Sequence, residues 1–246
     1  MTMQKSLLQA NSIGKSFGGF VALDAVDIAV RPGERVGLIG PNGSGKSTLV
    51  NCLSGAINSD TGTISFDGRA IERLPAYQRT RLGLMRTFQI PLPFMSMTVV
   101  ENLTIPLRFA GRRHPQAMTT ESDIEQALLI LEGVGLRDKA SESSAGLTQV
   151  EMRKLELARA VAARPKLLIA DETMAGLSNA EVDEIILLLL KLNDQGIAII
   201  MIEHIMRAVI AFSQRAIVLV AGRKIADDTP DVVMNDAEVV RAYLGE

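Results

Sequence analysis

The sequence has one cysteine and almost no net charge, and each scarcity excludes a class of protein. Cys52 has no second cysteine to pair with, so an internal disulfide framework is excluded and a reducing compartment is indicated. The 26 basic and 28 acidic residues leave a formal net charge of −2, which provides no electrostatic footprint for DNA or RNA. We therefore expect no nucleic-acid partner, and we expect Cys52 to be buried as a small hydrophobic residue.

Long apolar runs are also lacking. The longest, residues 185–190 and 197–202, are far shorter than the roughly 18 residues that span a bilayer. The first residues lack the apolar stretch of a secretory signal. We expect a protein that is soluble by itself, so that any membrane association comes through a partner. Its 246 residues, 47% of them hydrophobic and 22% charged, suffice for one globular domain with or without a subdomain.

The strongest signal is a glycine-rich loop at residues 40–48, which matches the pattern G-x-x-x-x-G-K-[ST]. Residues 35–39 are typical of a buried strand, and residues 46–55 of a helix that ends in glycine. Glycines let backbone N–H groups converge on phosphates, and the helix start adds its dipole. We expect Lys46 to reach the β- and γ-phosphates of ATP and the Ser47 hydroxyl to bind Mg²⁺. The alternative is a glycine-rich turn without a chemical role. The predicted nucleotide-binding residues of this loop are Gly40, Pro41, Asn42, Gly43, Ser44, Gly45, Lys46, Ser47 and Thr48.

Two further buried strands end in polar residues. Residues 167–170 lead to Asp171 and Glu172, and residues 197–202 lead to Glu203 and His204. Ligands of open α/β sheets bind at the carboxyl ends of the strands, so these side chains should face the same site as the glycine-rich loop. We expect Asp171 to hold Mg²⁺ through water, Glu172 to polarise the attacking water, and His204 to contact the γ-phosphate. The alternatives are a polar pair that merely ends a strand and a structural histidine.

The N-terminal part predicts a small antiparallel layer beside the nucleotide. Residues 7–13 and 20–30 are β-like and are separated by Gly18 and Gly19. Phe17, directly before the two glycines, is a candidate platform on which adenine stacks. The alternative is an aromatic residue of the core.

The middle of the chain predicts mainly helices. Residues 62–68 indicate a strand and a turn, and residues 77–86 indicate a helix that leads to a strand ending at Gln89. The apolar, proline-containing residues 90–95 either pack into the core or form a docking surface. Two helices are expected within residues 97–140 and 148–163. Capping boxes are predicted at Ser122 with Glu125 and at Ser178 with Glu181, and Ile124, Leu128 and Leu131 are predicted to share one helix face.

In this order and spacing, the motifs resemble those of the nucleotide-binding subunits of ABC transporters over essentially the whole chain. The resemblance implies an α/β fold, a P-loop NTPase of the ABC type with a mixed-sheet core, a small antiparallel β layer and a helical subdomain. It implies one ABC ATPase domain over residues 1–246, with a catalytic core at 1–96 and 160–246 and a helical subdomain at about 97–159. The implied roles are Walker A at 40–48, a Q-loop at Gln89 that also binds the metal, Walker B at 167–171, the catalytic Glu172, a D-loop at 175–178 and the switch histidine His204.

Finer motifs are similar to the LivG type, the ATP-binding subunit of branched-chain amino-acid importers. They lie at residues 16–19, 51–55, 86–89, 97–103, 155–159 and 242–246. The resemblance implies hydrolysis of ATP with Mg²⁺ to drive import of branched-chain or related amino acids. The implied partners are transmembrane permease subunits, a second ABC ATPase subunit and, indirectly, a periplasmic or extracellular solute-binding protein. The implied location is the cytoplasmic face of the inner membrane, where the chain is peripheral. Alternatives are transport of urea or an amide, lipopolysaccharide export, and a non-transport ABC ATPase.

The signature motif departs from the family pattern Leu-Ser-Gly-Gly-Gln. It aligns with Leu147, Thr148, Gln149, Val150 and Glu151. Val150 is expected to add bulk and to disfavour a glycine-only backbone at the γ-phosphate of a partner's nucleotide. Glu151 in place of glutamine is expected to add like charge, which costs on the order of 2 to 4 kcal/mol and would weaken the binding of a nucleotide between two subunits. We therefore favour a heterodimer with a sister ATPase over a homodimer, and tolerated drift in a normal pair is the alternative.

Overall fold

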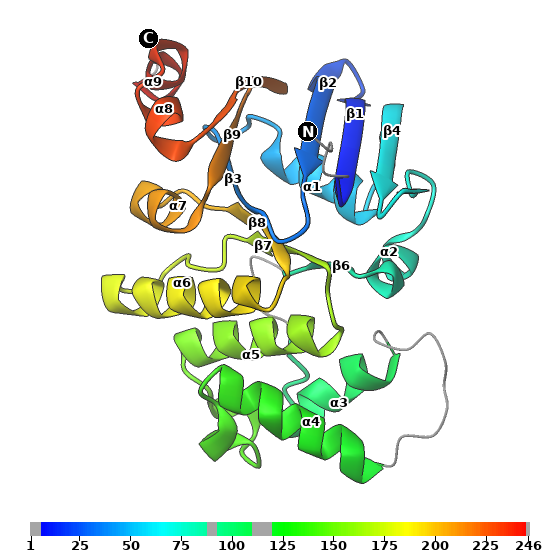
Figure 1. The fold of residues 1–246 in the computed structure, drawn as a ribbon, viewed down its shortest axis with the longest axis vertical. Coiled ribbons are helices and arrows are strands. Elements are labelled where there is room, and N and C mark those ends of the chain that lie inside the picture. Colours follow the sequence, from blue (N-terminus) through cyan, green and yellow to red (C-terminus); the bar gives the residue numbers. More distant parts are fainter. Residues whose placement is uncertain (1–5, 88–92, 110–119, 245–246) are drawn as a thin grey trace, which may run out of the picture.

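The computed structural model describes residues 6–87, 93–109 and 120–244. A six-stranded sheet forms its centre, in the order β10-β9-β3-β8-β7-β6 (Figure 1). These strands are β3 (Arg35–Ile39), β6 (Leu84–Arg86), β7 (Leu167–Asp171), β8 (Ala198–Ile202), β9 (Arg215–Val220) and β10 (Arg223–Asp228). All neighbours pair in parallel except β10, which is antiparallel to β9. Every residue of β7 and β8 is buried, as the continuous apolar runs predict for a parallel sheet.

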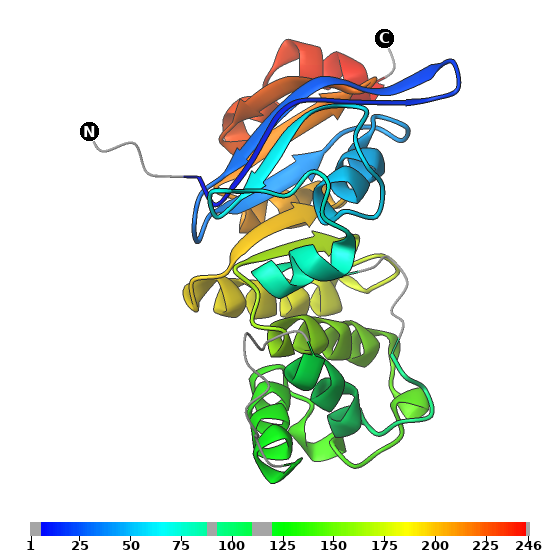
Figure 2. The same cartoon turned by 90° about the vertical axis from the view of Figure 1, so that its right-hand side faces the viewer.

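The predicted antiparallel layer is confirmed as a second sheet, in the order β2-β1-β4-β5. Its strands are β1 (Leu8–Phe17), β2 (Phe20–Val30), β4 (Thr61–Phe66) and β5 (Arg69–Ala70). Strand β1 extends to Phe17, beyond the predicted end at residue 13, because Phe17 pairs directly with Phe20 across the glycine turn. The resulting hairpin, blue in Figure 2, projects beyond the rest of the sheet.

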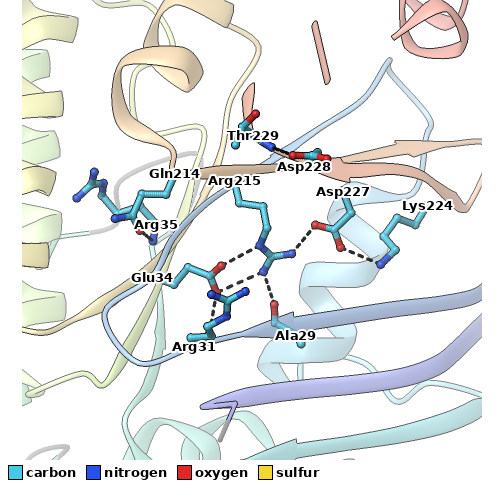
Figure 3. Close-up of polar contacts among 10 residues, drawn as sticks. All are labelled: Ala29, Arg31, Glu34, Arg35, Gln214, Arg215, Lys224, Asp227, Asp228 and Thr229. Atoms are coloured by element: carbon cyan, nitrogen blue, oxygen red, sulfur yellow. Dashed lines mark hydrogen bonds and ion pairs between the residues drawn. The ribbon is translucent and has the colours of Figure 1, made fainter. Parts of the chain in front are cut away.

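One arginine joins the two sheets (Figure 3). Arg215 on β9 donates from Nε to Glu34 Oε1 at 2.8 Å and also pairs with Asp227 on β10. Its remaining nitrogen donates to the carbonyl of Ala29 on β2. The guanidinium therefore joins Asp227 on the neighbouring strand to Ala29 and Glu34, which lie more than 180 positions away in the sequence. Lys224 gives Asp227 a second cationic partner at 2.9 Å.

Helices lie beside both sheets. Those of the core are α1 (Lys46–Ser54), α2 (Ala76–Leu82), α6 (Asn179–Asp194), α7 (Met206–Phe212), α8 (Pro230–Met234) and α9 (Ala237–Leu244). The sequence did not predict α7 or β10 as separate elements.

The capping box of Ser178 and Glu181 is confirmed at the start of α6. Cys52 is fully buried, as expected, and burial raises its pKa to about 11.

The middle of the chain forms α3 (Val99–Phe109), α4 (Thr120–Gly133) and α5 (Gln149–Ala162), which pack on one another in the green part of Figure 1. Two short 3-10 turns, Arg137–Lys139 and Ser144–Gly146, connect α4 to α5. The predicted capping box at Ser122 is wrong, because α4 already begins at Thr120. The predicted apolar face is also wrong in part: Ile124 is exposed, and the buried face consists of Asp123, Ala127 and Leu131.

Three apolar clusters form the core. One runs from α3–α5 into β7 and α6, the second lies between the two sheets around α1, and the third joins the end of β3 to α7, β9, α8 and α9. The first cluster is continuous across residue 160, so the boundary of the helical subdomain at about 97–159 stays a prediction. Within the described residues, no helix is both long and apolar enough to cross a bilayer.

Candidate functional site

The glycine-rich loop, hereafter the phosphate loop (residues 40–48), joins β3 to α1 as predicted. Gly45 precedes α1 with a φ of 102°, and a Cβ there would lie 2.7 Å from the carbonyl of Ala22. At Gly40, with a φ of 149°, a Cβ would lie 2.1 Å from the carbonyl of Leu219. Only glycine fits at these two positions. No described side chain caps α1 and its first turn holds no acidic residue, so its N–H groups and dipole are available to an anion.

The side chain of Lys46 is held by the first two residues of the phosphate loop. Its Nζ donates to the carbonyl oxygens of Gly40 at 2.8 Å and Pro41 at 3.0 Å. Burial lowers the pKa of the Lys46 ammonium from its ordinary value, and the carboxylates of Glu172 and Asp171 oppose that change. Strands β3 and β7 both pair in parallel with β8, so the phosphate loop and the residues after β7 lie at the same edge of the sheet, as predicted. Ser47 is exposed in the first turn of α1.

Asp171 is 7% exposed at the end of β7. Its Oδ2 pairs with Arg86 Nη2 at 2.7 Å, and Arg86 also donates to Asn51 Oδ1 on α1 at 2.6 Å. Sequence reasoning did not assign Arg86 or Asn51 to the site. The position of Arg86 at the end of β6, beside β7, could have indicated this pair, because carboxyl ends of parallel strands lie at one edge.

Glu172 directly follows β7 and adopts a φ of 47°, in the left-handed region. For a residue with a Cβ this backbone costs about 1 to 2 kcal/mol. The backbone N–H of Glu172 donates to the carbonyl of Ile202 at 3.0 Å. Its Oε1 lies 2.9 Å from Nε2 of His204, which follows β8. The turn therefore aims Glu172 at His204, and the structure brings these two predicted residues together.

A third acidic residue lies behind this pair. Glu203 is 3% exposed and accepts a hydrogen bond from the backbone N–H of Met174 at 2.9 Å. Burial raises the pKa of Glu203 to about 7, with a smaller contribution from the charge of Glu172. Sequence reasoning named Glu203 as part of the strand end but gave it no role.

Phe17 is 51% exposed at the end of β1, so the alternative of a core aromatic is wrong. The Lys15 ammonium lies 5.5 Å from the centre of its ring. The ring is accessible to a planar ligand.

Gln89 and residues 90–92 lie outside the described residues. At the end of the same apolar run, Phe94 and Met95 are exposed.

The signature residues begin α5. Thr148 is the N-cap, and it forms a capping box with Glu151. Gln149 Nε2 donates to the carbonyl of Ala175, in the predicted D-loop, at 3.2 Å. Among the described residues, no hydrogen bond or ion pair joins this segment to the phosphate loop of the same chain, and Figure 1 shows α5 on the far side of β7 from α1.

The structure changes both expectations about this segment. The like charge expected of Glu151 is paired with a cation, because its Oε1 lies 2.8 Å from Lys139 Nζ, and this bond holds the pKa of Glu151 below its ordinary value. Val150 does not occupy a glycine-only backbone, because it is the second residue of a helix without a positive φ, and its side chain packs against the first core cluster.

The fold and this site define a nucleotide-binding P-loop protein, and comparison with known proteins gives its family. Residues 23–175 match the family model for the ABC transporter, and residues 223–246 match that for the branched-chain amino acid ATP-binding cassette transporter. The chain is 37% identical to the high-affinity branched-chain amino acid transport ATP-binding protein LivG of Salmonella typhimurium, over 99% of this chain and all of that protein. It is 34% identical to the lipopolysaccharide export system ATP-binding protein LptB of Haemophilus influenzae, over 98% of both.

A solved structure of the ADP conformation of an ATP-binding cassette of an ABC transporter superposes with a TM-score of 0.88 and 32% identity, covering 98% of this chain and all of that one. The chain belongs to the ABC transporter family of ATP-binding proteins. Members of this family bind and hydrolyse ATP, dimerise and work with transmembrane permease subunits, with which they associate peripherally.

Proposed function

We propose that this chain is the ATP-hydrolysing subunit of an importer for branched-chain or related amino acids. The observation that carries the proposal is the full-length similarity to LivG, together with the match of residues 223–246 to a model named for branched-chain amino-acid transporters. The substrate does not touch an ATPase subunit, so the site supports the hydrolysis and the similarity supports the choice of substrate.

In this proposal, the phosphate loop and the start of α1 bind the nucleotide phosphates, and Phe17 stacks on the adenine. Lys46 leaves its carbonyl partners to contact the β- and γ-phosphates. Glu172 accepts a proton from the attacking water, and His204 orients Glu172 and contacts the γ-phosphate. The left-handed backbone of Glu172 fixes its direction before the nucleotide arrives, which lowers the cost of assembling the site.

The donor set fits Mg²⁺. Among the described residues, no group of three or more His, Cys, Asp or Glu side chains is arranged to hold a metal ion, so an ion here would have few protein ligands, which is how Mg²⁺ is usually bound beside phosphates. Ser47, Asp171 and Gln89 would hold it. Mg²⁺ would neutralise charge on the phosphates. Both hydrogen bonds that Arg86 donates to Asp171 go to Oδ2, so Oδ1 is the oxygen that would take part.

The assembly that we propose places two ATPase subunits under the permease, at the cytoplasmic face of the inner membrane. A solute-binding protein delivers the amino acid from the other side. The apolar residues 90–95 dock on the permease, and the exposure of Phe94 and Met95 supports this role. The helical subdomain at about 97–159 carries the signature segment to the nucleotide of the partner subunit.

We further propose that the second ATPase is a sister chain. With Glu151 paired to Lys139, this proposal rests on the bulk of Val150 alone. A β-branched side chain at the second position of α5 limits how closely the helix start can approach a γ-phosphate.

A second candidate is the ATPase of a lipopolysaccharide exporter, which the 34% identity to LptB favours. The test is ATP hydrolysis by the chain assembled with its permease in lipid nanodiscs. We expect stimulation by a leucine-loaded binding protein and none by lipopolysaccharide. Glu172→Gln is the control that removes hydrolysis. Stimulation by lipopolysaccharide alone would overturn the importer proposal.

A further inference from the structure

The first residue of α5 is tied to the turn that follows Glu172. Gln149 Nε2 donates to the carbonyl of Ala175 at 3.2 Å. A Cβ at Gly176 would lie 2.6 Å from the same nitrogen, so a side chain there would have to displace the amide. The amide of Gln149 therefore occupies space that is open because residue 176 is glycine, and the φ of 79° at this position also favours glycine.

The turn that accepts this bond, residues 172–177, is itself fixed. The N–H of Met174 donates to the carboxylate of Glu203 at 2.9 Å, and the side chain of Met174 is fully buried. The N–H of Ala175 donates to the carbonyl of Glu172 at 3.3 Å. Because the turn is held by the ends of β7 and β8, the bond from Gln149 fixes the start of α5 to a firm support.

The bond lies at the end of α5 that has free donors. In the part of the chain that the structure describes, no side chain accepts from the backbone N–H groups of Gln149 and Val150. One turn further along, Lys154 pairs with Glu184 of α6 at 2.6 Å. This ion pair holds the second turn of the helix, and the Gln149 bond holds its start. Without that bond the helix start can turn about the ion pair and carry its donors with it.

We propose that Gln149 is a positioning residue for the nucleotide of the partner subunit. Through the carbonyl of Ala175, its side chain holds the start of α5 in the direction in which the two free N–H groups meet the γ-phosphate. The proposal deepens the proposed function and rests on the role given there to the signature segment. The side chain of Gln149 touches its own subunit and no phosphate.

The first test removes the bond and keeps the length of the side chain. Gln149→Met has no donor, and Gln78→Met on α2, where the amide bonds the adjacent Tyr77, is the matched control. We expect Gln149→Met to raise the KM for ATP of the assembled transporter about three- to tenfold, the range of one ordinary hydrogen bond. The inhibition constant of ADP, which has no γ-phosphate, should not change, and Gln78→Met should change neither value. A rise of less than threefold, or equal changes for ATP and ADP, would overturn the proposal.

The second test uses the overlap at Gly176. Gly176→Ala adds the Cβ that displaces the amide of Gln149, so it should also raise the KM for ATP. Combined with Gln149→Ala, which leaves room for that Cβ, it should raise the KM no further than Gln149→Ala does alone. Gly196→Ala is the matched control, because Gly196 has a similar φ of 88° and open space around its Cβ. Effects that multiply in the double variant would contradict a single shared contact.

Thr148→Asp separates this proposal from the one on which it rests. Aspartate keeps an N-cap acceptor and adds a negative charge at the helix start, which should repel a γ-phosphate whether or not the Gln149 bond is present. If Thr148→Asp raises the KM for ATP and Gln149→Met does not, only the positioning role fails. If neither variant changes it, the proposed role of the signature segment fails as well.

Discussion

Glu203 makes the stability of this protein depend on pH in a direction opposite to that of most carboxylates. Its pKa is about 7 in the folded chain, against an ordinary value of 4.5, because the side chain is buried. Between these two values the folded state binds more protons than the unfolded state, so stability falls as pH rises. The difference of about 2.5 pKa units corresponds to about 3 kcal/mol lost above pH 7.

Glu203→Gln should remove this loss. The amide oxygen can still accept from the backbone N–H of Met174, and no charge has to be buried at any pH. We expect urea denaturation to give a stability difference between the variant and the original chain that grows by about 2 to 3 kcal/mol from pH 5 to pH 8. Above pH 8 the difference should be constant, with the variant more stable.

Glu101→Gln is the control, since hydrogen bonds from Thr98 hold the pKa of Glu101 below its ordinary value. Glu101 therefore contributes stability that is lost only as pH falls below 4.5, and its variant should show a constant difference between pH 5 and pH 8. A pH-independent difference for Glu203→Gln over the same range would refute the reasoning, because it would mean that the buried carboxyl titrates normally.

Three further changes test other parts of the structure. Glu172→Gln should lower the rate of ATP hydrolysis by about 100-fold or more, measured as phosphate release, while the Kd for ATP stays the same, because only the proton acceptor is lost. Arg215→Met should lower the free energy of unfolding by about 3 kcal/mol in urea titrations, because it leaves the buried carboxylate of Glu34 without its cation and leaves Asp227 with Lys224 alone. Val150→Gly should raise ATP hydrolysis by the assembled transporter, and an unchanged rate would support a normal pair without asymmetry.

The sequence predicted the parts of the site that depend on one stretch of chain. The phosphate loop, the ends of β7 and β8 and the capping box of α6 each follow from local spacing. Contacts between distant segments were not predictable in this way. The pair of Arg86 with Asp171 joins residues 85 positions apart, and Gly222, near the C-terminal end of the chain, donates its N–H to the carbonyl of Ser44 in the phosphate loop. The wrong face of α4 has the same origin, because burial of Asp123 depends on Arg108 of α3, which pairs with it at 2.7 Å.

The start of α5 shows how a local departure from a motif can keep its physical role. A helix start has four backbone N–H groups without partners inside the helix. Here the Thr148 hydroxyl takes the N–H of Glu151, and within the described residues no side chain takes those of Gln149 and Val150. Two donors and the helix dipole therefore remain for a phosphate from a partner subunit. Because Lys139 neutralises Glu151, charge does not oppose that approach. The size of the Val150 side chain is then the variable that decides whether this subunit completes its partner's site.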